Sequence, residues 1–174
     1  MANQTIVQAE AGRQEIVLTY VFDASIKKVF EAFIQKNIVR QWLVPLNSVL
    51  EIESYLIQNN GKYRYTIIDE SGDKHTFCGV VHEVLYLERI IQTFEYETTP
   101  KNGEVSLEVL SFMPLDNNST KLTHQSIFRS VAERDAVLIT KNSEGPLKEE
   151  KKLGIIDIYN RLSTILNKKS KVNL

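Results

Sequence analysis

The chain has 174 residues, of which 43% are hydrophobic and 25% are charged, and its formal net charge is −1. This composition predicts one folded domain over residues 1–174, with its core over about residues 14–167. Positive and negative charges are interspersed, which excludes the basic surface that nucleic-acid binding needs and the basic cluster that holds a protein on a membrane. We therefore expect no nucleic-acid partner and no membrane partner.

The cysteine count and the first residues constrain the compartment. Cys78 is the single cysteine, so it cannot form an internal disulfide. Residues 1–10 lack the charged start and the apolar run of a signal peptide, and no apolar run approaches the roughly 18 residues that span a bilayer. These features predict a soluble, cytoplasmic protein.

The first elements change from strand to helix. Residues 14–22 alternate in the direction of their apolar side chains, which predicts a strand. Asp23 and Ser25 are residue types that cap helices, and a helical pattern of apolar residues follows them. A second, shorter helical run carries Trp42 and ends before Pro45, because the residue before a proline is disfavoured in a helix.

After the second helical run, the period of the apolar residues returns to two. The predicted strands cover residues 48–55, 62–69, 76–85, 89–97, 104–113 and 121–128, and a short helix is predicted over 131–138. Asn-Gly, Ser-Gly and Asn-Asn turn sequences separate several of these strands. Because such turns are short, neighbouring strands must be antiparallel, and the pattern predicts a meander.

The last predicted element is a long amphipathic helix over residues 145–169. Ile155, Tyr159 and Leu162 recur at helical spacing, and Pro146 suits a first helical turn. An antiparallel sheet with one apolar face has to be covered, and this helix is the element available to cover it. The sequence therefore predicts an α+β fold in which a curved antiparallel sheet wraps around the long C-terminal helix, with two short helices after the first strand.

Five stretches of sequence carry a resemblance that extends over about residues 14–166: VFDASIKKVFEAF with VRQWLVP, NNGKYRYTIIDESGDKHTFCGVVHEV, LERIIQTFEYE, GEVSLEVLSFMPLDNNSTKLTHQ and KLGIIDIYNRLSTIL. In order and spacing they resemble the START-like (SRPBCC) superfamily, and within it the homologues of the activator of the heat-shock-protein-90 ATPase. One departure lies at the start of the last helix, where the Gly-Trp pair of the family reads Gly154-Ile155.

The resemblance implies the helix-grip fold and a hollow between the sheet and the C-terminal helix. It does not imply one function, because the superfamily includes lipid carriers, cyclases and hormone receptors. The family name suggests a role in the stress response with a chaperone as partner. The eukaryotic activators that this domain resembles also carry a separate N-terminal domain that docks on the chaperone, and we expect no room for it in 174 residues.

Strand parity predicts which side chains face the hollow. The inward set comprises Tyr63, Tyr65 and Ile67; Ile90, Gln92, Phe94 and Tyr96; Val105, Leu107, Val109 and Met113; and Leu122, His124, Ser126 and Phe128. Most of these residues are apolar, but Gln92, His124 and Ser126 are polar, and a buried polar group without a partner costs about 1–3 kcal/mol. Such groups either bond to one another and to ordered water, or they meet the polar part of a ligand.

Parity and the C-terminal helix together predict a ligand site. Its residues are Tyr63, Tyr65, Gln92, Phe94, Tyr96, His124, Ser126, Phe128, Ile155, Tyr159 and Leu162. The ligand that we expect is a small hydrophobic or amphipathic molecule, which the apolar walls would bury and which His124 or Gln92 would orient. This function needs neither catalysis nor a cofactor.

Two other functions stay open. The outer sheet face or the helix surface could dock on a chaperone or another protein, and the sheet edges could pair two copies into a homodimer. An enzyme such as a cyclase or a hydrolase would need an acid–base pair that faces the hollow, and the predicted parity supplies none. The three histidines lack the spacing of metal ligands, and Cys78 lies in mid-strand, so we expect no metal site and a packed thiol.

Overall fold

The structure is a computed structural model that describes residues 5–45, 47–97, 104–139 and 150–168. Its strands are β1 (Thr5–Gln8), β2 (Glu15–Phe22), β3 (Val49–Tyr55), β4 (Lys62–Ile68), β5 (Lys74–Leu85), β6 (Arg89–Tyr96), β7 (Glu104–Asp116) and β8 (Ser119–Phe128). Its helices are α1 (Ile26–Ile34), α2 (Lys36–Val39), α3 (Val131–Ile139) and α4 (Glu150–Asn167).

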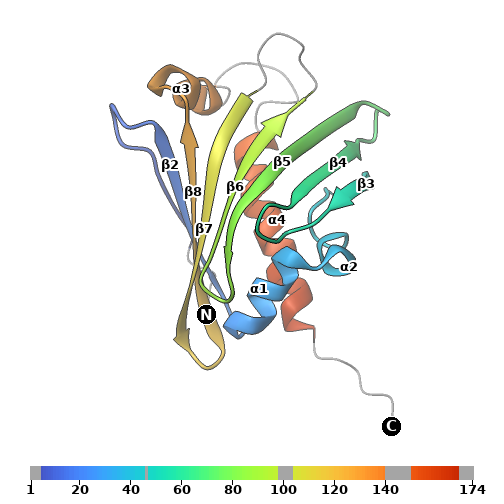
Figure 1. The fold of residues 1–174 in the computed structure, drawn as a ribbon, viewed down its shortest axis with the longest axis vertical. Coiled ribbons are helices and arrows are strands. Elements are labelled where there is room, and N and C mark those ends of the chain that lie inside the picture. The colour runs from blue at the N-terminus through green and yellow to red at the C-terminus, as the bar shows by residue number, and fades with distance from the viewer. Residues whose placement is uncertain (1–4, 46, 98–103, 140–149, 169–174) are drawn as a thin grey trace.

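All of these strands form one antiparallel sheet in the order β1-β2-β8-β7-β6-β5-β4-β3. After β2 the chain passes through α1 and α2 to the far edge of the sheet, and the meander from β3 to β8 then returns until β8 pairs with β2. Figure 1 shows the sheet curving around α4, with α1 and α2 at one end of the face that α4 covers. The predicted helix-grip fold is confirmed.

Local sequence explains several of the turns and helix ends. In the β4–β5 hairpin, Gly72 has a φ of 86°, and the Asp69 carboxylate accepts hydrogen bonds from the backbone N–H groups of Ser71 and Asp73. Ser25 occupies the N-cap of α1 as predicted, but its side chain forms no capping hydrogen bond. The helix is instead held by its apolar face, where Phe30 and its neighbours are buried.

Two differences concern the ends of the chain. Strand β1 was not predicted, because its four residues are too few to show a period. It pairs with β2 at the edge of the sheet. The two short helices therefore follow the second strand and not the first. The described part of α4 begins at Glu150, while Gly145 and Pro146 lie outside the described residues.

The predicted parity of β7 was wrong. Ser106, Glu108 and Leu110 are buried, whereas Leu107 is 36% exposed and Met113 is 44% exposed. Near the start of β7 the odd-numbered residues are more apolar than the even-numbered ones. This pattern led to the wrong prediction that the odd-numbered side chains face the core. The register with β8 decides the true phase, because it sets Leu110 opposite His124 and Glu108 opposite Ser126 on the inner face.

The core contains a cluster of aromatic rings where α1 meets the sheet. The Phe112 ring of β7 lies 5.0 Å from the Phe30 ring and 5.4 Å from the Phe33 ring, and Phe33 also lies 5.1 Å from Trp42. The Trp42 indole N–H donates to the carbonyl of Ala32 at 3.2 Å, so the one polar atom of this ring is satisfied. The space between the sheet and α4 forms a groove, and α1 and α2 close one end of it.

A search of the described helices for a membrane span found none that is long and apolar enough.

Candidate functional site

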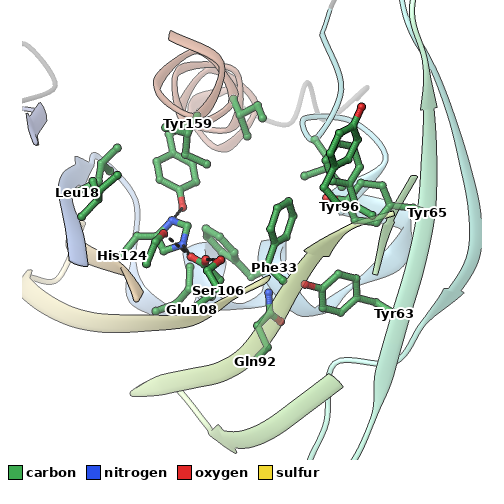
Figure 2. A pocket seen from close by; sticks show the side chains of 18 of the residues that line it. Leu18, Phe33, Tyr63, Tyr65, Gln92, Tyr96, Ser106, Glu108, His124 and Tyr159 are labelled. Atoms are coloured by element: carbon green, nitrogen blue, oxygen red, sulfur yellow. Dashed lines mark hydrogen bonds and ion pairs between the residues drawn. The ribbon is translucent and has the colours of Figure 1, made fainter. Parts of the chain in front are cut away.

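A cavity of about 440 Å³ lies between the inner face of the sheet and α4. Figure 2 shows its two sides: tyrosine side chains from β4 and β6 on one, and a polar cluster from β7, β8 and α4 on the other. The lining residues are Val7, Ile16, Leu18, Phe33, Trp42, Leu43, Tyr55, Ile57, Tyr63, Tyr65, Phe77, Gln92, Phe94, Tyr96, Ser106, Glu108, Leu110, His124, Ser126, Phe128, Val137, Ile155, Ile158 and Tyr159.

The aromatic side is a connected row of rings. The ring centres of Tyr63 and Tyr65 lie 6.1 Å apart, Tyr65 and Phe77 lie 5.4 Å apart, and Phe77 and Phe94 lie 5.4 Å apart. Such contacts fix the direction of each ring and present a largely apolar wall.

Gly79 explains how Tyr63 fits into this wall. The Tyr63 hydroxyl donates to the carbonyl of Thr93 at 2.7 Å, so the ring lies across the backbone of β5. A Cβ atom at Gly79 would lie 2.6 Å from the Tyr63 ring, closer than real Cβ contacts allow. Glycine at this position therefore permits the position of Tyr63.

The polar side is a cluster around the carboxylate of Glu108. The Nε2 atom of His124 lies 2.5 Å from Glu108 Oε2, and the Ser126 hydroxyl donates to the same oxygen at 2.6 Å. The Ser106 hydroxyl donates to the other carboxylate oxygen. On the far side of the imidazole, His124 Nδ1 lies 2.7 Å from the hydroxyl of Tyr159 on α4 (Figure 2).

These contacts determine the charge of Glu108. Burial alone would raise the pKa of this carboxyl, but the hydrogen bonds and charge of His124, with the hydroxyls of Ser106 and Ser126, hold the pKa below its ordinary value. Burial, together with the charge of Glu108, raises the pKa of Tyr159 well above its ordinary value. At neutral pH the cluster therefore contains an ionised carboxylate and a protonated phenol.

The cluster connects three elements. The Tyr159 hydroxyl of α4 and the Glu108 carboxylate of β7 lie at the two nitrogens of the His124 imidazole of β8. The arrangement is a chain of hydrogen bonds from α4 through the imidazole to the carboxylate.

A second chain of the same kind lies beside the β4–β5 hairpin. His75 Nδ1 lies 2.8 Å from the hydroxyl of Tyr96, a cavity residue, and His75 Nε2 lies 3.0 Å from Asp69. The hydrogen bond from His75 lowers the pKa of Asp69. This chain ties the end of β6 to the hairpin and fixes the orientation of the Tyr96 ring.

The structure brings ten of the eleven predicted ligand-site residues to the cavity: Tyr63, Tyr65, Gln92, Phe94, Tyr96, His124, Ser126, Phe128, Ile155 and Tyr159. Leu162 does not line it, because this side chain is fully buried in the core one turn further along α4. The Gln92 amide points into the cavity (Figure 2) and forms no side-chain hydrogen bond within the described residues. The role of these residues in ligand binding stays a prediction.

The sequence analysis missed Ser106 and Glu108 as cavity residues. It therefore also missed that the Glu108 carboxylate and the His124 imidazole form a pair that faces the cavity. The wrong phase of β7 had turned both residues outward. A signal existed in the sequence: Leu110 and Phe112 continue the same face of the strand, and two large apolar residues in the middle of a strand mark the core side.

The other candidates for chemistry lie outside the cavity. Cys78 is not among the lining residues, and burial raises the pKa of its thiol to about 11, so the nucleophilic thiolate is scarce at neutral pH. No group of three or more His, Cys, Asp or Glu side chains that could hold a metal ion occurs in the part of the chain that the structure describes.

Comparison with known proteins shows the family of the chain. Residues 23–167 match the family described as Activator of Hsp90 ATPase homolog 1-like protein. The chain belongs to this family. A search of curated proteins found no match.

Solved structures share the fold of this family member. A crystal structure from Mycobacterium smegmatis has a TM-score of 0.78 at 13% identity, and the match covers 95% of this chain and 99% of that one. A solution structure from Staphylococcus epidermidis has a TM-score of 0.75 at 18% identity, covering 97% of both chains. A crystal structure from Chromobacterium violaceum has a TM-score of 0.71 at 21% identity, covering 90% of this chain and 99% of that one. At these identities the likeness concerns the fold.

Proposed function

We propose that this protein binds a small hydrophobic or amphipathic molecule in the cavity between the sheet and α4. The observation that carries the proposal is the cavity itself: about 440 Å³ of space, bounded by aromatic and aliphatic side chains and by one buried polar cluster. Known ligand sites have this character, with volumes of about 300–1,000 Å³, mostly apolar walls and a few polar groups that orient the ligand.

The energetics are sufficient for useful affinity. A ligand that buries about 200 Å² of apolar surface gains roughly 5 kcal/mol at about 25 cal/mol per Å², before the cost of association is subtracted. The aromatic rings are already held by contacts with one another, so little side-chain freedom is lost on binding. The binding site is in this sense preorganised.

Binding is favoured over catalysis by the way in which the polar cluster is bonded. Both nitrogens of His124 are within hydrogen-bond distance of protein atoms, and both oxygens of Glu108 accept hydrogen bonds. A general base needs a lone pair that can reach the substrate proton. Here both imidazole nitrogens face protein groups, so the cluster is suited to orient a ligand rather than to react with it.

Filling the cavity tests this proposal. Ile155 lines the cavity from α4, and the Ile155→Trp variant places an indole in that space. Binding of the neutral dye Nile red, followed by its fluorescence, should fall at least about tenfold because the ligand volume is occupied, a loss of about 1.4 kcal/mol in binding free energy. Unfolding in urea shows whether the variant keeps the fold.

Asp157→Trp is the matched control, because Asp157 lies two residues further along α4, is exposed and does not line the cavity. It should bind the dye like the parent protein. Equal binding by the parent and the folded Ile155→Trp protein would contradict the proposal.

A second candidate function is an interaction of the co-chaperone type in the stress response, which the description of the family suggests. One structural observation favours it: Leu107, Met113 and Leu115 of β7 are 36%, 44% and 50% exposed on the outer side of the sheet. Stimulation of a purified chaperone ATPase by this protein, lost when Leu107 and Met113 are both changed to Ser, would support this function. No stimulation would exclude it.

A further inference from the structure

Few charged side chains line the cavity. Among the lining residues that the structure describes, Glu108 is the one acidic side chain, and there is neither lysine nor arginine. The other polar atoms belong to hydroxyl, amide, indole and imidazole groups, which are neutral unless an imidazole gains a proton. The formal charge of the site therefore depends on Glu108 and on its partner His124.

Glu108 is ionised although its side chain is only 8% exposed. Three donors from His124, Ser106 and Ser126 stabilise the carboxylate. An isolated buried carboxylate would instead bind a proton, because transfer of a charge out of water is costly. The hydrogen bonds thus keep a negative charge in an apolar cavity.

His124 lies between the carboxylate and α4, with Nε2 toward Glu108 and Nδ1 toward the Tyr159 hydroxyl. Both ring nitrogens are thus engaged within the protein, and the acidic group that the described lining offers a ligand is Glu108.

The field of this charge extends across the cavity. Burial is the main cause that raises the pKa values of Tyr63 and Tyr65 on the opposite side of the cavity, and the charge of Glu108 raises both pKa values further. The aromatic faces of this side have negative electrostatic potential of their own and attract cations. The carboxylate can accept about four hydrogen bonds, of which three are used, so one acceptor position is left for a ligand.

The geometry points to an amphipathic amine as the ligand class: a protonated amine head placed near Glu108 and an apolar body placed against Tyr63, Tyr65 and Phe94. The same arrangement disfavours carboxylates and other anions, which would meet a buried negative charge with no lysine or arginine of the described lining to balance it. This inference rests on the proposed function, because it specifies which molecule the cavity takes.

Three probes with one apolar body and different heads test the inference. Naphthylethylamine is a cation at neutral pH, naphthylethanol is neutral, and naphthylacetic acid is an anion. Isothermal titration calorimetry of the unaltered protein should give the tightest binding for the amine, about tenfold weaker binding for the alcohol, and weaker binding still for the acid. An acid or an alcohol that binds as tightly as the amine would overturn the inference and leave the proposed function in place.

A failure of the proposed function looks different, because then none of the three probes binds, and the inference falls with it. The series on the unaltered protein decides the matter even where a variant fails to fold.

The Glu108→Gln variant assigns the effect to one residue. Removing the charge should abolish the preference for the amine over the alcohol. Glu95→Gln is the matched control, because Glu95 lies on the neighbouring strand β6 and does not line the cavity. If a folded Glu108→Gln protein kept the amine preference, the assignment to Glu108 would be wrong.

Discussion

The two ends of the groove beneath the sheet are built on opposite principles. At the end closed by α1 and α2, the ring centre of Phe112 lies 5.0 Å from that of Phe30 and 5.4 Å from that of Phe33. At the other end the same strands continue, but β7 turns Ser106 and Glu108 inward and a cavity of about 440 Å³ is left. Close packing supplies stability at the first end, and space with one polar cluster forms the proposed binding site at the second.

The largest expected effect is a difference in stability between variants at the two ends. Phe30 is fully buried at the closed end, so Phe30→Ala should lower the free energy of unfolding by about 3–5 kcal/mol, measured by urea denaturation. Phe94 borders space that is already open, so Phe94→Ala should lower it by less than about 2 kcal/mol. Equal losses for the two variants would show that the cavity end is packed as tightly as the closed end.

The next effect concerns the polar cluster. His124→Leu removes the hydrogen-bond partner of the buried Glu108 carboxylate and of the Tyr159 hydroxyl, which should lower the free energy of unfolding by about 3 kcal/mol. His82→Leu, on an exposed position of β5, should change it by less than about 0.5 kcal/mol. Urea denaturation measures both variants.

The double variant sharpens this result. Glu108→Leu removes the buried charge, so His124→Leu combined with it should cost less than the sum of the two single changes, by about 1–3 kcal/mol. Strict additivity would mean that the contact between Glu108 and His124 contributes no coupling free energy.

The smallest effect tests which side chains of β7 face the core. Leu107→Ser changes a side chain on the outer face and should alter the free energy of unfolding by less than about 0.5 kcal/mol. Leu110→Ser, three residues along on the inner face, should lower it by about 2 kcal/mol or more, because Leu110 is buried. A larger loss for Leu107→Ser would restore the strand phase that the sequence alone had suggested.

The closed end and the architecture could be predicted from the sequence because their signals are local and repeated. The apolar face of α1, the turn at Gly72 and the spacing of Tyr159 and Leu162 on α4 each follow from a period or a turn residue. Eight of the predicted site residues reach the cavity because strand parity held on β4, β6 and β8, and Ile155 and Tyr159 reach it through the helical period of α4.

The polar cluster could not be predicted in this way. Glu108 violates the rule that charged residues face solvent, and it does so because His124, Ser126 and Ser106 supply its hydrogen bonds. Those partners come from β8 and from two residues earlier on the same strand, and Tyr159 comes from a helix 35 residues after His124. A set of contacts that depends on register across strands leaves no period in the sequence.

Crystallography of the protein under xenon pressure tests the central claim most directly, because xenon occupies apolar cavities that are open inside a protein. The account predicts xenon density between the aromatic row of Tyr63, Tyr65 and Phe94 and the helix α4, near Ile158. Side-chain atoms of the protein filling that space, with no xenon bound there, would contradict it.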